Sequence, residues 1–216
     1  RNFDHMDIQD YVDEMNLNSP YRHWMHGNSI EIDDDGNIFI SNRTMSEIIK
    51  FDRQSGELIW RLGGPMNDFT FINDPLNGPN RQHDARRLEN GNIMIFDNGD
   101  GRFPPLTRVV EYEIDEQQMT ATLVWEYSHP EGYISLNQGC AQRLENQNTL
   151  ISWGGVSNHG QIITEVDYNG NRVLEFEYPS GNHSYKVRKS NWEFDINLIE
   201  GDLNLDGSID ILDIIA

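Results

Sequence analysis

Short apolar runs alternate with polar turns along residues 26–180, and the same series of runs occurs three times. Each copy contains one short apolar run after a polar turn, at 38–41 (IFIS), 93–96 (IMIF) and 149–152 (TLIS). A second run ends in an acidic turn, at 48–52, 109–115 and 162–167. A third run carries a large aromatic side chain, which is Trp60, Trp125 or Phe176. Runs of this length between polar turns predict short β-strands.

The copies follow one another at a nearly constant offset. Residues 85–92 (ARRLENGN) and 141–148 (AQRLENQN) match almost letter for letter at an offset of 56, and residues 30–37 lie 55 before the first of them. A period of this length with three to four strands per unit is typical of a β-propeller blade. A β-sandwich of short strands is the alternative, but a sandwich does not require a constant offset between its strands.

We therefore predict an all-β chain in which residues 1–198 form a partial β-propeller. A closed ring needs about four to eight blades, so we expect about four here, with extra strand material in 1–22, in 184–194 and in sequence outside this chain. The recurrent aromatic residues are expected to pack between neighbouring blades. The chain starts at Arg1 and ends at Ala216 inside an apolar run, which suggests a processed protein or a piece of a longer one.

Composition narrows the classes of partner. The chain has 36 acidic and 16 basic side chains and a formal charge of −20, which opposes binding to nucleic acid or to anionic lipid. Such acidity indicates a solvated surface or a saline, calcium-rich setting. We find no apolar run long enough to span a membrane and no leader peptide at the start. The single cysteine, Cys140, excludes an internal disulfide, and we expect a buried small residue there rather than a nucleophile.

Residues 199–216 contain a pattern typical of a calcium loop. A loop that begins at Asp202 places oxygen ligands at the alternating positions of an EF-hand loop, with Gly207 at the sharp turn. The predicted Ca²⁺ ligands are Asp202, Asn204, Asp206, the carbonyl of Ser208, Asp210 and Asp213. The aspartate at the last position and the missing entering helix resemble the dockerin type of calcium repeat. Dockerins carry two such repeats, so either the second is missing or the loop is a calcium-stabilised tail; an acidic tail without metal is the remaining alternative.

Histidines stand at related places in the copies. His26 and His83 lie immediately before the first strand of their units, where propeller connections approach the central channel, and His159 follows the run at 149–152. Arg102 lies in a related loop of the second unit. A hydrogen-bonded structural role is the alternative for each of these residues. The other histidines match no motif, and we expect them to be surface or structural residues: His5, His23, His129 and His183.

Several stretches resemble one family, the bacterial arylsulfate sulfotransferases, which move a sulfuryl group from one phenol to another without a nucleotide donor. The matching stretches are HGNSI (26–30), LIWRLGG (58–64), QHDAR (82–86), FDNGDGR (96–102), LVWEY (123–127) and SYKVRKSNW (184–192). The resemblance implies a propeller that is six-bladed when complete, with a central pocket of histidines and an arginine. It also implies that one histidine is transiently sulfated and that neither a nucleotide cofactor nor a catalytic metal is needed.

Carried over by motif, the resemblance places His26, His83 and Arg102 in the pocket, and it makes His159, which follows a glycine pair, the candidate for the sulfated residue. We expect His83 to carry a proton between phenol oxygens. Arg86, Arg108 and Trp153 are further candidates for the pocket wall.

The same resemblance implies an aryl sulfate donor, a phenolic acceptor and a secreted or periplasmic location. The calcium-binding tail adds a protein partner or a neighbouring subunit as a further possibility. The alternative is a non-catalytic extracellular structural or adhesive propeller with a calcium-stabilised tail.

Overall fold

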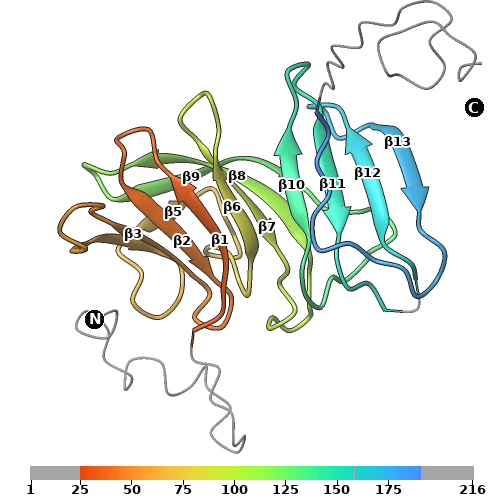
Figure 1. Ribbon diagram of the computed structural model, residues 1–216, viewed down its shortest axis with the longest axis horizontal. Coiled ribbons are helices and arrows are strands. Elements are labelled where there is room, and N and C mark those ends of the chain that lie inside the picture. The colour runs from red at the N-terminus through yellow and green to blue at the C-terminus, as the bar shows by residue number, and fades with distance from the viewer. Residues whose placement is uncertain (1–24, 158, 191–216) are drawn as a thin grey trace, which may run out of the picture.

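The computed structural model describes residues 25–157 and 159–190. Over these residues the chain forms thirteen β-strands and no helix, arranged as three sheets that stand side by side (Figure 1). The predicted all-β class is therefore confirmed. The described part of the chain contains no helix that is long and apolar enough to cross a membrane.

Each sheet is a meander of antiparallel strands, which we call blades 1, 2 and 3. Blade 1 consists of β1 (Gly27–Ile32), β2 (Ile38–Asn42), β3 (Glu47–Phe51) and β4 (Leu58–Leu62). Blade 2 consists of β6 (His83–Arg87), β7 (Ile93–Asp97), β8 (Arg108–Asp115) and β9 (Thr120–Tyr127), with β5 (Thr70–Ile72) parallel to β9 at its edge. Blade 3 consists of β10 (Cys140–Arg143), β11 (Thr149–Trp153), β12 (Ile162–Val166) and β13 (Arg172–Glu177).

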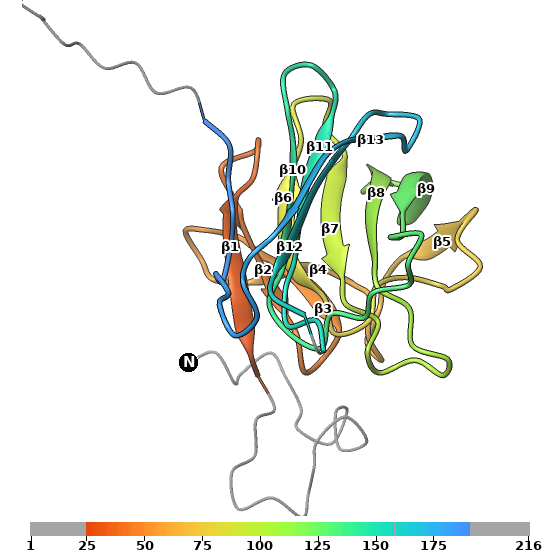
Figure 2. The same ribbon diagram turned by 90° about the vertical axis from the view of Figure 1, so that its right-hand side faces the viewer.

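The three copies of the sequence repeat are equivalent in the structure. The first hairpin of each blade closes on the same pair in the register: Ile32 with Ile38, Arg87 with Ile93, and Arg143 with Thr149. The first strands β1, β6 and β10 are neighbours, as both views of the ribbon show (Figure 2). Two predicted site residues, His26 directly before β1 and His83 at the start of β6, are therefore brought together. The number of blades in a closed ring stays a prediction.

Two apolar cores lie between the blades. The first joins Phe39, Ile48, Trp60 and Leu62 of blade 1 to Ile93, Val110 and Tyr112 of blade 2. The second joins Phe96, Trp125 and Tyr127 of blade 2 to Ile151, Trp153 and Ile162 of blade 3. Trp60 and Trp125 are buried between blades as predicted, whereas the side chain of Phe176 is 42% exposed because no described blade covers that face of blade 3.

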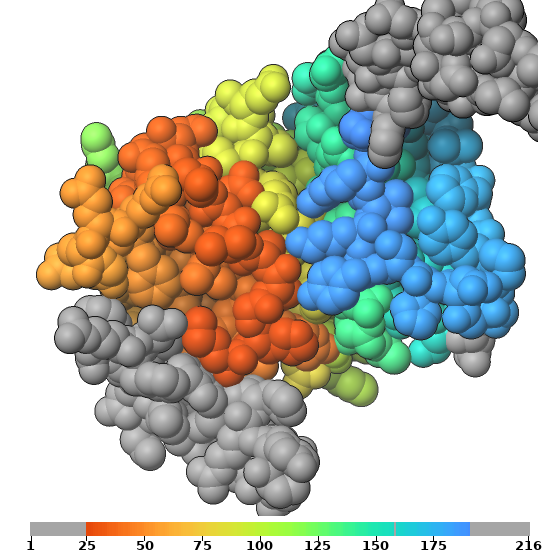
Figure 3. Space-filling view, viewed as in Figure 1, coloured from red at the N-terminus to blue at the C-terminus, as the bar shows by residue number. Residues whose placement is uncertain are grey.

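Residues 184–190 run beside β10 and lie between the surfaces of blades 1 and 3 (Figure 3). The amide of Val187 donates to Cys140 Sγ over 3.3 Å, and Lys189 Nζ lies 2.9 Å from Glu165 Oε2. The second contact repeats the one between blades 2 and 3, where Arg143 lies 2.6 Å from Glu111. The segment therefore occupies the position next to blade 3 that β10 occupies next to blade 2, although it forms no strand.

Candidate active site

His83, the first residue of β6, is buried at the meeting point of the blades. Its Nδ1 lies 2.7 Å from Asn98 Oδ1, and Asn98 Nδ2 donates to the carbonyl oxygens of Ser135 and Gln138. Because these two bonds fix the Asn98 amide, its oxygen faces His83 and Nδ1 carries the ring proton. Nε2 is then the basic nitrogen, and it accepts a longer bond of 3.2 Å from the amide of Gln138.

The surroundings of His83 keep its ring neutral. Burial of the ring lowers the pKa of His83 to about 4, and the positive charges of Arg43 and Lys186 act in the same direction. The hydrogen bond to Asn98 opposes this shift without reversing it. At neutral pH the residue therefore presents an unprotonated Nε2, which suits a nucleophile and does not suit a proton donor.

His26 and Arg43 complete the surroundings of this ring. His26 directly precedes β1, and its ring centroid lies 6.3 Å from that of His83, in an edge-on arrangement. Arg43 directly follows β2, and its amide donates to the carbonyl of His26. One terminal nitrogen of the Arg43 guanidinium donates to Asp100 Oδ2 and to the carbonyl of Leu136, each over 2.8 Å. These bonds hold the positive charge beside the two histidines.

Several buried polar atoms without a partner belong to residues connected to His83. Among the described residues, Gln82 precedes His83, the amide of Gln138 donates to it, and Ser135 accepts from Asn98, while Asp100 accepts from Arg43. The side-chain atoms that lack a hydrogen-bond partner are Arg43 Nε, Gln82 Oε1, Asp100 Oδ1, Ser135 Oγ and Gln138 Oε1. Buried polar atoms are nearly always paired, so a cluster of unpaired ones requires an explanation. A polar group that the described residues do not supply would satisfy the donors and acceptors among them.

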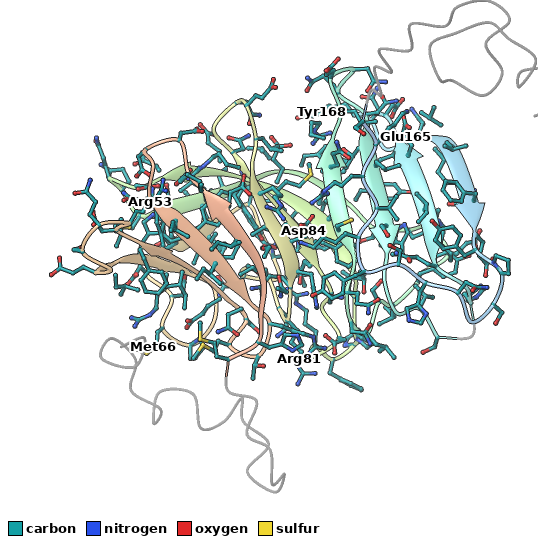
Figure 4. All side chains as sticks on the ribbon, in the orientation of Figure 1. Arg53, Met66, Arg81, Asp84, Glu165 and Tyr168 are labelled. Atoms are coloured by element: carbon teal, nitrogen blue, oxygen red, sulfur yellow. The ribbon has the colours of Figure 1, made fainter. Side chains whose placement is uncertain are left out.

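The 184–190 segment adds an aromatic ring and two cations. The ring of Tyr185 lies 6.2 Å from that of His83. Lys186 Nζ and Arg188 lie 2.8 and 2.6 Å from the carboxylate of Asp84, the residue after His83, which Figure 4 labels at the centre of the molecule. Arg86 Nε lies 3.1 Å from the same carboxylate.

Arg102 is placed apart from this group. Its guanidinium lies 3.0 and 2.9 Å from the two oxygens of Asp97 and donates to the carbonyl of Gly78. It lines a cavity of about 440 Å³ together with Arg81, which Figure 4 shows at the lower edge of the molecule. The contacts of Arg102 thus run to Asp97 and Gly78 rather than to His83.

His159 lines a cavity with Gln138, the residue whose amide donates to His83 Nε2. The side chain of His159 is 40% exposed, and Nδ1 lies 3.3 Å from Glu177 Oε1. The cavity has a volume of about 190 Å³ and is also lined by His183, which was expected at the surface. Of the four residues predicted for the site, the structure thus brings together His26 and His83 and leaves Arg102 and His159 at its borders.

Two of the further candidates for the pocket wall are closed off from solvent. Arg108 and Trp153 are fully buried, so neither lines an open pocket. Cys140 is buried as predicted, and burial raises the pKa of its thiol. The predicted calcium ligands, Asp202 to Asp213, lie outside the described residues.

Sequence reasoning missed Arg43 and Asn98. A signal for both was present, because the first residue after the second strand of each blade is Arg43, Asn98 or Gly154. Arg102 stands four residues beyond Asn98, in a loop whose path the repeat does not determine. Aligning the ends of the second strands, rather than the nearest basic residues, would have selected the two side chains that surround His83.

The fold and the site define an all-β protein of propeller-like sheets with paired histidines where the first strands meet. Comparison with known families is specific: the sequence model of the arylsulfotransferase (ASST) family matches residues 2–187. Because this match covers most of the chain, the chain belongs to that family.

Individual relatives agree with the family match. The chain is 30% identical over 205 residues to arylsulfate sulfotransferase AssT of Escherichia coli O6:H1, covering 71% of this chain and 32% of that protein. It is 32% identical over 104 residues to AssT of Lelliottia amnigena, covering 40% of this chain and 17% of that protein. Among solved structures, the β-propeller domain of Swd1 from Myceliophteria thermophila is 10% identical, with a TM-score of 0.46 over 72% of this chain and 44% of that one. The chain spans a third or less of the length of these curated relatives.

Proposed function

We propose that this chain carries the reacting centre of a nucleotide-independent sulfotransferase, which moves a sulfuryl group from an aryl sulfate to a phenolic acceptor. The observation that carries the proposal is the neutral imidazole of His83, with its proton fixed on Nδ1 and cations beside it. The family membership of residues 2–187 supports the same reaction class.

In this proposal His83, rather than His159, is the residue that is sulfated. The lone pair of His83 Nε2 gives up the 3.2 Å bond from the Gln138 amide and attacks the sulfur. The N–S bond forms, and the bond from sulfur to the aryl oxygen breaks as phenolate leaves with the electron pair. The oxygen of the acceptor phenol then attacks the same sulfur, and the N–S electron pair returns to Nε2. While the ring carries sulfur it is positively charged, and Asn98 Oδ1 stabilises that charge through the Nδ1 proton.

The cations supply the binding of the anion. A protein with a formal charge of −20 repels an aryl sulfate unless positive donors converge locally. Arg43 offers a buried Nε without a partner among the described residues, directed by the two bonds of its terminal nitrogen. In a loose transition state, as in phosphoryl transfer, negative charge is spread over the sulfuryl oxygens, so a fixed and correctly placed donor there stabilises it.

His26 and Tyr185 have complementary roles in the same proposal. The ring of His26 stands beside His83 and is exposed, so it is placed to give a proton to the departing phenolate and to take one from the acceptor. The ring of Tyr185, whose centroid lies 6.2 Å from that of His83, offers a face for the aryl group.

A single incubation tests the proposal. The protein is mixed with a chromogenic aryl sulfate and a phenol, and release of the donor phenol is followed while mass spectrometry of peptides locates any sulfated histidine. We expect the adduct on His83, its loss in His83→Asn and its retention in His159→Asn. An adduct on His159 would contradict the assignment, and absence of both transfer and adduct would favour a non-catalytic structural propeller.

For residues 199–216 we propose a bound Ca²⁺ held by Asp202, Asn204, Asp206, Ser208, Asp210 and Asp213, on a secreted or periplasmic protein whose tail contacts another protein or subunit. The acidic ligand pattern supports the metal. Calorimetric titration should show one calcium per chain, and the variant Asp202→Ala should lose it. Equal calcium uptake by this variant would contradict the proposed loop.

A further inference from the structure

Asp84 occupies a position at which the other blades make a different contact. Ser29, Asp84 and Cys140 are equivalent in the repeat, at offsets of 55 and 56. Ser29 Oγ accepts the amide of Ala85 over 3.1 Å, and Cys140 Sγ accepts the amide of Val187 over 3.3 Å. Each of these side chains therefore binds the backbone of the segment that follows its blade. The carboxylate of Asp84 instead binds side chains of residues 184–190, beyond blade 3.

The contacts of Asp84 are short and enclosed. The side chain has no exposed surface, and its two oxygens lie 2.8 Å from Lys186 Nζ and 2.6 Å from an Arg188 nitrogen. The backbone of Asp84 has a φ of 52°, in the left-handed region that aspartate and asparagine tolerate better than most residues. A buried carboxylate is stable only when it is paired, so the loss of these cations would leave an uncompensated buried charge.

Residues 184–190 have few other ties to blade 2. Their remaining hydrogen bonds and ion pairs to other segments, within the described chain, go to blade 3, at Cys140, Ala141, Gln142, Gln161 and Glu165. Asp84 is thus the ion-paired link between this segment and the strand that carries His83. The same segment places the Tyr185 ring beside that histidine.

We propose that Asp84 is a positioning residue, which anchors residues 184–190 to β6 and so holds Tyr185 and Lys186 beside His83. The docking part of this inference depends only on the contacts of Asp84. The kinetic part rests on the proposed sulfuryl transfer.

Hydrogen exchange of the amide of Val187 tests the docking. Asp84→Asn keeps the shape and the backbone conformation of the residue but removes the charge. Hydrogen bonds to a charged group contribute enough that their loss should lower the protection of Val187 by roughly tenfold to a hundredfold. Glu165→Gln is the matched control, since it removes a carboxylate bound to the same segment at Lys189, whose side chain is 57% exposed. We expect this control to leave the protection of Val187 nearly unchanged.

The KM for the aryl sulfate gives a second test, because KM should change if Asp84 positions the site and should not change if Asp84 only stabilises the fold. When the docked fraction falls, apparent substrate affinity falls in proportion, so KM for the aryl sulfate should rise about tenfold in Asp84→Asn. The kcat of the folded variant should stay within about twofold, because His83 and Asn98 are untouched. Lys186→Gln should raise KM similarly, and the double variant should raise it no further than either single change.

The outcomes separate the two proposals. Unchanged protection of Val187 in Asp84→Asn would overturn the anchor, whatever the activity. Absence of transfer by the unmodified protein would defeat the proposed function, while the exchange measurement would still decide the anchor. If Asp84→Asn does not fold, the double variant Lys186→Gln/Arg188→Gln removes both cations of the segment and leaves Asp84 paired with Arg86. Full protection of Val187 in this double variant would equally overturn the anchor.

Discussion

The protonation state of His83 depends on one amide side chain and on burial. Asn98 directs its oxygen at Nδ1 because its nitrogen is held by two backbone carbonyls. With the proton fixed there, Nε2 is basic, and burial keeps the second proton off at neutral pH. An exposed histidine without such partners populates both tautomers and titrates near about 6.5. In the proposed reaction Asn98 therefore prepares the ring for nucleophilic attack, although it does not contact the reacting atoms.

This arrangement predicts where activity is lost in acid. The pKa of His83 is lowered from the ordinary value of 6.5 to about 4, so the neutral ring should persist, and kcat/KM should hold, until the pH falls through about 4. The profile is measured with an aryl sulfate, which stays ionised throughout this range. A fall in kcat/KM near pH 6.5, the ordinary pKa of histidine, would contradict a role for neutral His83.

A stability measurement must accompany that profile. The unfolded chain binds a proton at this histidine between the two pKa values and the folded chain does not, so stability is full above about pH 6.5 and declines as the pH falls toward 4. The shift corresponds to roughly 3 kcal/mol. Circular dichroism at each pH distinguishes loss of activity from loss of fold.

At the scale of elements, the blades are joined by a repeated charged contact at the first hairpins. Lys50 and Arg87 share the buried carboxylate of Asp33, at 2.8 and 2.6 Å. At the equivalent places, Glu111 pairs with Arg143, and Glu165 pairs with Lys189. A charged residue on the third strand thus lies in each contact, and the following segment supplies a cation. These contacts join neighbouring blades near the first hairpins, whereas His26 and His83 stand at the other ends of the first strands.

Asp33 allows this contact to be tested by pH. Burial alone would raise the pKa of Asp33, but hydrogen bonds from Arg87 and Lys50 outweigh it and lower the pKa from 3.8 to about 2. The native carboxylate therefore contributes about 2 kcal/mol of stability, which is present above about pH 4 and is lost as the pH falls through about 2. Asp33→Asn should be less stable at pH 7, and the difference should vanish in acid.

Urea unfolding of both proteins across this pH range measures the difference. Asp34→Asn, an exposed neighbour in the same turn, is the control and should show no comparable gap. A gap that stays constant down to pH 2 would mean that the Asp33 contact is not electrostatic.

The strands were predictable because their signal is local and repeated three times. The apolar runs and the 55 to 56 residue offset gave the three meanders and their hairpins. Strand β5 was not predicted, since three residues are too few to show a period and its pairing with β9 depends on a distant segment. The placement of residues 184–190 depends on side chains of blades 2 and 3 in the same way.

At the scale of the whole molecule, the repeat predicted where the site lies but only part of its composition. His26 and His83 stand at the starts of first strands, and the repeat fixes those ends. Arg102 and His159 stand inside loops, where a few residues of path decide which way a side chain points. A shift of one residue in a strand likewise reverses the face of every side chain. Sequence alone therefore identified the histidine pair and missed Arg43, whose guanidinium is directed by contacts from other blades.

The free energy of unfolding should depend more on side chains packed between two blades than on side chains on the outer face of blade 3. Trp153 is fully buried between blades 2 and 3, against the rings of Phe96 and His129, and its Nε1 donates to Thr164. Trp153→Ala should cost about 3–5 kcal/mol, because truncation of a buried aromatic leaves a cavity. Phe176, on the outer face of blade 3, is 42% exposed, so Phe176→Ala should cost about 1 kcal/mol or less.

Thermal unfolding of the two variants compares these faces directly. In a chain of this size the first change should lower Tm by roughly 10 °C and the second by no more than about 3 °C. The two substitutions each remove one aromatic ring, so their difference reports the packing at the two positions. Equal losses would mean that the outer face of blade 3 is covered in solution, and the cost of Phe176→Ala would then depend on protein concentration if a second copy covers it.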